Sequence, residues 1–406
     1  MSLVQKYRQL GTDSRLYLIF ISFFWLYGFF GAFWRRIGIE PNIANTILLF
    51  ILAVACHGKW RHSVRASDIA LYLIFVFLYF ISASIYPVSR VLVMKFAFEV
   101  LLVAAPFYFV GVIIKAEEYS YWLVLLSRLS IIINVFFSLF LSSQSTQIAE
   151  QMHRAYMVLP SVLYLLWRML ESFKKADLLF FSVGFFMLCS MGTRGPFVCV
   201  LFFALVYLFF FKEWKHKTVV RIVLVLTGIV LYAISSYIAM FMVQLLGSIG
   251  LSTRIFDSML DDALLNYENS NGRNEIQEEL LQQLSMDNNG LGYGLFSDRI
   301  FSSYGFSSHN MIIELWFSFG YYIGSAILGL LLLLFVRFFI KAKNDHIKVF
   351  GLIFFTSSVI KLMFSDCFIL DGFLFFLIGY CVNGLRASKS KTVFKGSEIE
   401  PKINMA

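Results

Sequence analysis

Three side chains in the second half of the sequence have residue types suited to moving a group from a phosphate to a hydroxyl. Arg194 lies in the segment MGTRGP, Arg273 opens an amphipathic stretch, and His309 lies in SSHN, with Glu314 shortly after it. A guanidinium can bind a diphosphate through two parallel hydrogen bonds. A histidine of ordinary pKa can accept a proton from a hydroxyl. If these side chains converge, they could bind a diphosphate leaving group and activate an acceptor.

Each of these residues also has a plainer interpretation. Arg194 could anchor a helix at a membrane interface. Arg273 could be a solvated residue at a helix start, where a cation opposes the helix dipole. His309 and Asn310 could form a helix N-cap pair. The functional hypothesis depends on their predicted positions on the same side of a membrane and at a similar depth.

The composition is that of a membrane protein. Of 406 residues, only 15% are charged, 59% are hydrophobic and 47 are phenylalanine, and the mean hydropathy is +0.76. Because a soluble domain carries roughly 25% charged residues, the composition excludes a soluble globular enzyme, a disordered chain and a collagen-like fibre. The five cysteines contain no CxxC pair. We therefore expect neither a zinc site nor a disulfide framework.

Apolar runs long enough to cross a bilayer of about 30 Å as helices recur along the chain. They predict an all-α polytopic membrane protein with about 12 transmembrane helices and one large extracytoplasmic loop. The predicted spans are residues 16–34, 42–57, 69–86, 92–114, 121–143, 154–170, 177–192, 196–211, 219–243, 311–336, 347–364 and 367–385. The predicted organisation is transmembrane helices 1–9 in 1–243, the loop in 244–310, transmembrane helices 10–12 in 311–385 and a basic cytoplasmic tail in 386–406.

The basic residues orient this arrangement. With the N-terminus inside, 23 of the 34 Lys and Arg residues fall in cytoplasmic segments, 8 on the opposite side and 3 within spans. This bias agrees with the positive-inside rule and places both termini in the cytoplasm. The net charge of +9 then needs no nucleic-acid partner.

Lys95, Glu99, Arg128 and Lys361 are charged residues inside predicted spans, where charges are costly and are usually paired or functional. Lys95 and Glu99 are four residues apart and could neutralise each other on one helix face. The alternatives are a proton or ion path, or a groove on the acceptor side.

The loop contains a second recognisable pattern. Residues 273–285 place apolar side chains on one helical stripe and glutamates opposite, which predicts a short amphipathic helix lying on the membrane or against the bundle. The stripe consists of Ile276, Leu280, Leu281 and Leu284. The segment GLGYG, residues 290–294, predicts a tight turn whose glycines adopt positive φ. It lacks the Gly-Lys-Ser/Thr ending of a nucleotide-binding loop.

Three blocks of sequence resemble the O-antigen polymerase and ligase superfamily of bacterial envelope glycosyltransferases. They are MGTRGPFVCVLFF (191–203), GRNEIQEELLQQLSMDNNGLGYGLF (272–296) and SSHNMIIELWFSFGYYIG (307–324). The segment FSDCFI (364–369) is similar to a region around an Asp found late in the ligases. The resemblance implies a GT-C-like fold and an inverting transfer of an oligosaccharide from undecaprenyl diphosphate, without metal or cofactor.

The resemblance also implies roles for individual residues. Arg194 and Arg273 would bind the diphosphate, and His309 would be the catalytic base. Further substrate-site candidates are Arg154, Arg90, Glu314 and Asp366. The expected partners are undecaprenyl-diphosphate-linked donor and acceptor and membrane lipids, with a polysaccharide chain-length regulator as a candidate. The expected location is the bacterial inner membrane, with the site facing the periplasm.

The block 307–324 looks closer to polymerases, so we expect an O-antigen polymerase. An O-antigen ligase, which would transfer polymer to the lipid A core, is the alternative within the superfamily. A polyprenyl-linked oligosaccharide flippase or secondary transporter is the alternative from another class. Such folds often contain related halves and interrupted helices, whereas this chain has only six prolines and no visible internal repeat.

Overall fold

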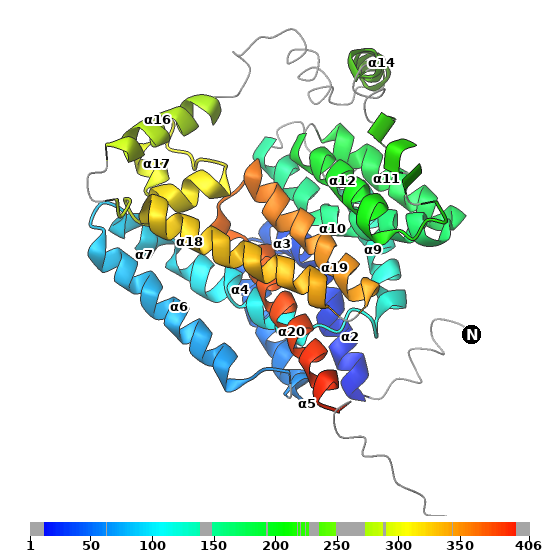
Figure 1. Cartoon of the computed structure of the whole chain (residues 1–406), viewed down its shortest axis with the longest axis horizontal. Coiled ribbons are helices and arrows are strands. Elements are labelled where there is room, and N and C mark those ends of the chain that lie inside the picture. The colour runs from blue at the N-terminus through cyan, green and yellow to red at the C-terminus, as the bar shows by residue number, and fades with distance from the viewer. Residues whose placement is uncertain are drawn as a thin grey trace, which may run out of the picture.

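The computed structural model describes residues 12–61, 63–138, 148–191, 194–216, 218–219, 221–223, 225–226, 235–248, 273–286, 290–342 and 344–394. Every regular element in these ranges is a helix (Figure 1). The first ten are α2 (Thr12–Trp25), α3 (Tyr27–Arg36), α4 (Pro41–Ala55), α5 (His57–Trp60), α6 (Ala66–Ile85), α7 (Arg90–Phe98), the π-helical η1 (Glu99–Ala104), α8 (Phe107–Ile113), α9 (Ser120–Phe136) and α10 (Ile148–Ser172).

The chain continues through a second set of helices, which includes the predicted loop and the last spans. They are α11 (Lys175–Ser190), α12 (Arg194–Val206), the π-helical η3 (Tyr207–Phe211), α14 (Ser235–Ser248), α16 (Arg273–Ser285), α17 (Asp298–Phe301), α18 (Met311–Lys341), α19 (Asp345–Phe355), the π-helical η5 (Thr356–Ile360), the 3-10 turns η6 (Lys361–Met363) and η7 (Phe368–Leu370), and α20 (Gly372–Phe394).

Several helices have the length and apolarity of membrane spans. Five segments qualify among the described residues: Ala66–Ile85, Arg90–Ile113, Arg194–Phe211, Met311–Lys341 and Asp345–Met363. The pair α2 and α3, bent by 71°, would make a sixth if it forms one broken span. The all-helical class with several helices of membrane-spanning length is therefore confirmed. The number of twelve stays a prediction, because several apolar runs form helices too short to qualify and part of 219–243, including 227–234, lies outside the described residues.

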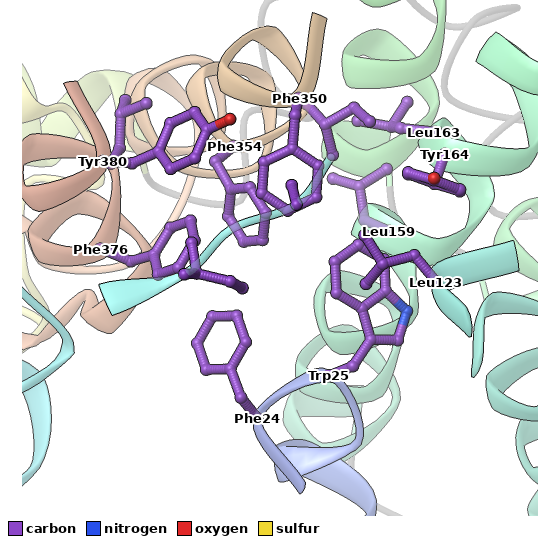
Figure 2. Close-up of a cluster of buried hydrophobic side chains, with 14 of the residues drawn as sticks. Phe24, Trp25, Leu123, Leu159, Leu163, Tyr164, Phe350, Phe354, Phe376 and Tyr380 are labelled. Atoms are coloured by element: carbon purple, nitrogen blue, oxygen red, sulfur yellow. The ribbon is translucent and has the colours of Figure 1, made fainter. Parts of the chain in front are cut away.

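The centre of the molecule is an aromatic and aliphatic core around α10. Leu159 and Tyr164 of α10 are fully buried and lie with Phe350 and Phe354 of α19 (Figure 2). The rings of Phe354 and Phe376 are 4.2 Å apart between centroids. Aromatic pairs of this kind add about 0.5–1.5 kcal/mol beyond their buried area. The high phenylalanine content thus builds a rigid frame that joins α2, α10, α19 and α20.

The predicted amphipathic helix is confirmed as α16. Ile276, Leu280 and Leu284 are buried and pack against Ile313 and Phe317 of α18. The apolar stripe therefore faces the helix bundle rather than lipid. Ser270 and Asn271, whose side chains suit the cap of this helix, lie outside the described residues.

Two intramembrane or near-membrane arginines have buried carboxylate partners. Arg128 donates to Asp177 at 2.6 Å between α9 and α11. Arg386 of α20 forms two hydrogen bonds with Asp68 of α6, at 2.7 and 2.8 Å. Tyr108 donates a further hydrogen bond to Asp68 at 2.7 Å. These pairs compensate the charges that α6, α9, α11 and α20 bury.

Lys95 and Glu99 do not pair with each other, although both belong to the described chain. Lys95 is exposed and lies 5.6 Å from the ring of Phe96, while Glu99 accepts a long hydrogen bond of 3.4 Å from Asn42. The two side chains take different partners: Lys95 lies beside Phe96, whereas Glu99, where η1 begins, contacts Asn42 of α4. The predicted neutralisation was wrong.

The closest helix pair in the bundle is α8 with α20, and glycines make it possible. A Cβ on Gly111 would collide with the backbone of Phe376 and Tyr380, and one on Gly379 would collide with the carbonyl of Tyr108. Small residues allow such close approach between helices in membranes.

We predict that Gly111→Ala destabilises the protein by about 1–3 kcal/mol, because backbone atoms cannot rotate away from the new methyl group. The measurement is the thermal midpoint of the purified protein in detergent. The matched control is Gly329→Ala in α18, where nothing lies within 4 Å of the added Cβ and where alanine should be neutral or slightly stabilising. Equal midpoints for the two variants would contradict the packing.

Candidate functional site

A cavity of about 560 Å³ lies where α3, α4, η1 and α10 meet the segments 305–309 and 361–373. Its volume is in the range of small-molecule sites. Both signs of charge line it. The charged and histidine side chains of its lining are Arg35, Glu99, His153, Arg154, Arg299, His309, Lys361, Asp366 and Asp371.

His309 reaches this cavity because the backbone turns sharply before α18. Its φ is +51°, a left-handed conformation that is uncommon for a residue other than glycine. The next residue, Asn310, caps α18 by accepting hydrogen bonds from the N–H groups of Ile312 at 2.9 Å and Ile313 at 3.3 Å. The helix-cap interpretation therefore holds for Asn310, whereas His309 lines the cavity.

Two neighbouring helices hold the backbone just before His309. The N–H of Ser308 donates to Asp298 of α17 at 2.9 Å, and Gln277 of α16 donates to the carbonyl of Ser308 at 3.1 Å. Burial raises the pKa of the Asp298 carboxyl, while the hydrogen bond from Ser308 and the charge of Arg299 lower it. The loop helix α16, predicted from its apolar stripe, thus helps to position the candidate base.

The imidazole of His309 is held in its neutral form. Burial and, to a smaller extent, the charges of Arg273 and Arg299 lower its pKa to about 4, and the charge of Asp366 opposes them. Its Nδ1 is buried without a hydrogen-bond partner. A neutral imidazole carries one nitrogen that can accept a proton, so His309 is in the protonation state that a base requires.

Another part of the cavity wall is the segment 361–373, which hydrogen bonds to Glu314 connect to α18. This carboxylate is 1% exposed and accepts hydrogen bonds from the Cys367 thiol and from the Phe368 N–H. Glu314 was expected at the substrate site, but it does not line the cavity. It orders the segment that presents Asp366, whose φ of +71° is also left-handed.

Asp366 lies in the cavity wall as part of a charged cluster. Lys361, whose side chain is 7% exposed, forms an ion pair with Asp366 at 2.9 Å and another with Asp371. Its ammonium also lies 5.4 Å from the ring of Tyr156. The sequence identified Lys361 as an intramembrane charge, and the structure supplies its two carboxylate partners. Asp371 was not anticipated.

Three arginines, Arg35, Arg154 and Arg299, line the cavity without an ion pair to a carboxylate in the described part of the chain. Arg154, a low-ranked candidate from the sequence, and Arg299, which the sequence analysis missed, both have a buried Nε that makes no hydrogen bond. Arg299 lies 4.8 Å from the ring of Phe96 and 5.6 Å from that of Phe296. The sequence signal for Arg299 was its place shortly after the GLGYG turn.

The other predicted arginines lie outside the cavity lining. Arg273 donates to the carbonyl of Phe364 at 2.8 Å, beside the Asp366 segment, and its charge reaches His309. Arg194 is exposed at the start of α12. Its neighbour Gly195 lies so close to the hydroxyl of Tyr156, a cavity residue, that a Cβ would collide with it.

Arg90, another predicted substrate contact, interacts with a neighbouring helix rather than with the cavity. Its Nε donates to the carbonyl of Ala83 at 3.0 Å, which ties α7 to α6, and it does not line the cavity. Of the seven predicted residues, the structure thus brings His309, Arg154 and Asp366 into one cavity. Arg273 and Glu314 contact its wall.

The predicted glycine turn is confirmed and explains how the segment before Arg299 is placed. Gly290, Gly292 and Gly294 have φ of +64°, +73° and +91°. The N–H of Gly294 donates to the carbonyl of Ser318 at 3.0 Å. At the contact, Gly320 interrupts the helical geometry of α18 with φ +77°. Glycine is required here because the two backbones approach without room for a Cβ.

No protein-family model matches the sequence, and neither the curated proteins nor the solved structures contain a match. Within the residues that the structure describes, no three His, Cys, Asp or Glu side chains gather as metal ligands. The side chains of the cavity lining include a neutral histidine, three arginines without an ion pair to a carboxylate, Glu99 and a Lys–Asp cluster.

We predict that His309 stays neutral in the folded protein until the pH falls to about 4. The unfolded chain takes up this proton near pH 6.5, so the residue makes folding less favourable as the pH falls through that window. The measurement is an NMR titration of isotope-labelled histidine, with the His309 signal assigned by its loss in His309→Gln. A midpoint near 6.5 would contradict the burial of this imidazole.

Proposed function

We propose that this chain is a membrane glycosyltransferase that transfers an oligosaccharide from undecaprenyl diphosphate to a hydroxyl group. The observation that carries the proposal is the neutral His309 in one cavity with Arg154 and Arg299, neither of which has a carboxylate partner among the described residues. Two uncompensated guanidinium groups in a partly buried cavity favour an anionic ligand. A proton acceptor beside them favours attack by a hydroxyl.

The reaction requires one displacement. The acceptor oxygen forms a bond to the anomeric carbon, and its proton passes to the imidazole of His309. The bond between the anomeric carbon and the diphosphate oxygen breaks, and its electron pair leaves with the diphosphate. Arg154 and Arg299 would stabilise the charge on the leaving group. A single displacement inverts the anomeric configuration and needs no further energy source.

Binding of the donor would also raise the pKa of His309. The charges of Arg273 and Arg299 lower the pKa of His309, and a bound diphosphate would neutralise them. The pKa would then rise towards the ordinary value for histidine, where the imidazole is a better proton acceptor. The base would thus strengthen when the leaving group is in place.

Within this class we favour an O-antigen or other surface-polysaccharide polymerase, acting on the periplasmic side of the inner membrane. Its acceptor would be a second lipid-linked repeat unit, and a chain-length regulator is a candidate partner. The support is the resemblance of the block 307–324 to polymerases. A ligase would use the same donor and cavity with the lipid A core as acceptor.

A polyprenyl-linked oligosaccharide flippase or secondary transporter is the second candidate, and one observation favours it. Lys361 is buried in the span Asp345–Met363 and pairs with Asp366 and Asp371 at the cavity wall. Buried charge clusters of this kind occur in proton-coupled transporters. Two helices next to the cavity also contain π-helical segments, η1 and η5.

The deciding experiment is the surface-polysaccharide ladder of a deletion strain of the source organism. The strain is complemented with the intact chain, with His309→Ala or with His57→Ala at equal expression, because His57 is exposed and does not line the cavity. We predict that the deletion leaves core with a single repeat, that the intact chain and His57→Ala restore the ladder, and that His309→Ala loses at least about a hundredfold in polymer.

Other outcomes would contradict specific parts of the proposal. Bare core with long polymer left on the lipid carrier would indicate the ligase. Repeat units trapped on the cytoplasmic face would indicate the flippase. A full ladder from His309→Ala would remove His309 as the base.

A further inference from the structure

A wall of the cavity formed by η1 and α4 carries a carboxylate that the transfer chemistry does not use. Glu99 is half-buried within the span Arg90–Ile113 and lines the cavity. Among the described residues it forms no ion pair, and the hydrogen bond that it accepts from Asn42 is long, at 3.4 Å. A charge in a membrane-spanning segment is costly unless it is paired or functional. Glu99 therefore retains most of its capacity to accept hydrogen bonds.

The two asparagines near Glu99 differ in whether their side-chain amides are already used in hydrogen bonds within the protein. Asn45 is committed, because it accepts from Trp34 at 2.8 Å and donates to the carbonyl of Tyr27 at 3.2 Å. Asn42 makes only the long contact with Glu99 through its amide. The Asn42–Glu99 wall thus offers a carboxylate and a side-chain amide to the cavity, with the rings of Phe107 and Phe137 also in the lining.

This combination suits a group rich in hydroxyls. A carboxylate accepts strong hydrogen bonds from hydroxyl or ammonium groups, an amide can donate and accept, and aromatic rings can pack on the apolar face of a sugar ring. The same carboxylate repels a phosphate. Arg154 and Arg299, which line the cavity too, attract it.

We propose that the Asn42–Glu99 wall is a subsite for an uncharged or amine-bearing saccharide, the acceptor end of the substrate. This inference rests on the proposed glycosyltransferase function and assigns the acceptor to a definite pair of residues. The two parts of the substrate bind at side chains of opposite charge: the diphosphate binds at the arginines, and the hydroxyl-bearing sugar binds at Glu99. The cavity wall that takes the sugar lies where η1 begins at Glu99 and contacts Asn42 of α4.

The test measures binding of two separate probes to the full chain in detergent. One probe is the oligosaccharide released by mild acid from the organism's own lipid-linked pool, and the other is farnesyl diphosphate, which carries no sugar. We expect Glu99→Gln to weaken saccharide binding by about tenfold or more, the loss associated with a hydrogen bond to a charged group. Farnesyl diphosphate binding should stay within about twofold, well short of the loss of a charged hydrogen bond.

Two further variants make the result specific. Lys95→Gln removes an intramembrane charge one turn away that does not line the cavity, and it should change neither affinity. Asn42→Ala, on a different helix, should weaken saccharide binding, as Glu99→Gln does. Thermal midpoints confirm that each variant is folded.

Saccharide affinity that is absent in the wild type, or equal in the wild type and Glu99→Gln, would overturn the subsite. Saccharide binding that depends on Glu99 without any diphosphate binding would instead overturn the proposed transferase.

Discussion

The buried carboxylate of Glu314 joins the two segments that carry the chemistry of the cavity. It lies one turn into α18, just after His309, and accepts hydrogen bonds from Cys367 and Phe368 in the segment that presents Asp366. Because both of its oxygens are used and the residue is almost fully buried, removing either side of this contact would leave unsatisfied polar groups, each costing about 1–3 kcal/mol. The two parts of the cavity wall formed by the segments 305–309 and 361–373 depend on this tie.

The charged side chains discussed above form two groups: those that pair with a carboxylate and those that form no ion pair. Arg128 and Arg386 are matched to buried carboxylates, and Lys361 is matched to two. These groups satisfy the requirement that a buried ion be paired. Arg154 and Arg299 are held instead by the cavity wall, with a buried Nε left unpartnered. The cavity thus contains both kinds of charge, because the paired Lys361 lines it together with Arg154 and Arg299.

The proposed transfer and the proposed saccharide subsite share one physical principle. In both, the substrate supplies the opposite charge or the hydrogen-bond partner that a cavity side chain lacks in the empty protein. The pKa of His309 is low because burial and two arginines disfavour the imidazolium. A diphosphate would offset the arginines, and a sugar would occupy the wall beside Glu99. Catalytic strength would thus arise only when both ligands are bound, because each removes an uncompensated group. Binding energy of this kind is realised in the assembled complex rather than in the empty protein.

The sequence by itself determined the helical class with apolar membrane-type helices, the amphipathic helix at 273–285 and the glycine turn at 290–294, because hydrophobic periodicity and glycine chemistry are local properties. His309 and Asp366, which it offered as site candidates, both line the cavity. The sequence could not determine how many apolar runs become full spans, since helix breaks and π-helical turns depend on packing. Nor could it rank the arginines: Arg299 enters the cavity and Arg90 does not, because the glycine turn and two phenylalanine rings place one while a carbonyl of α6 holds the other. The pairing of Lys361 with Asp371 and the contact of Glu99 with Asn42 were likewise decided by tertiary structure, since each partner lies outside the helical element that carries the charged residue.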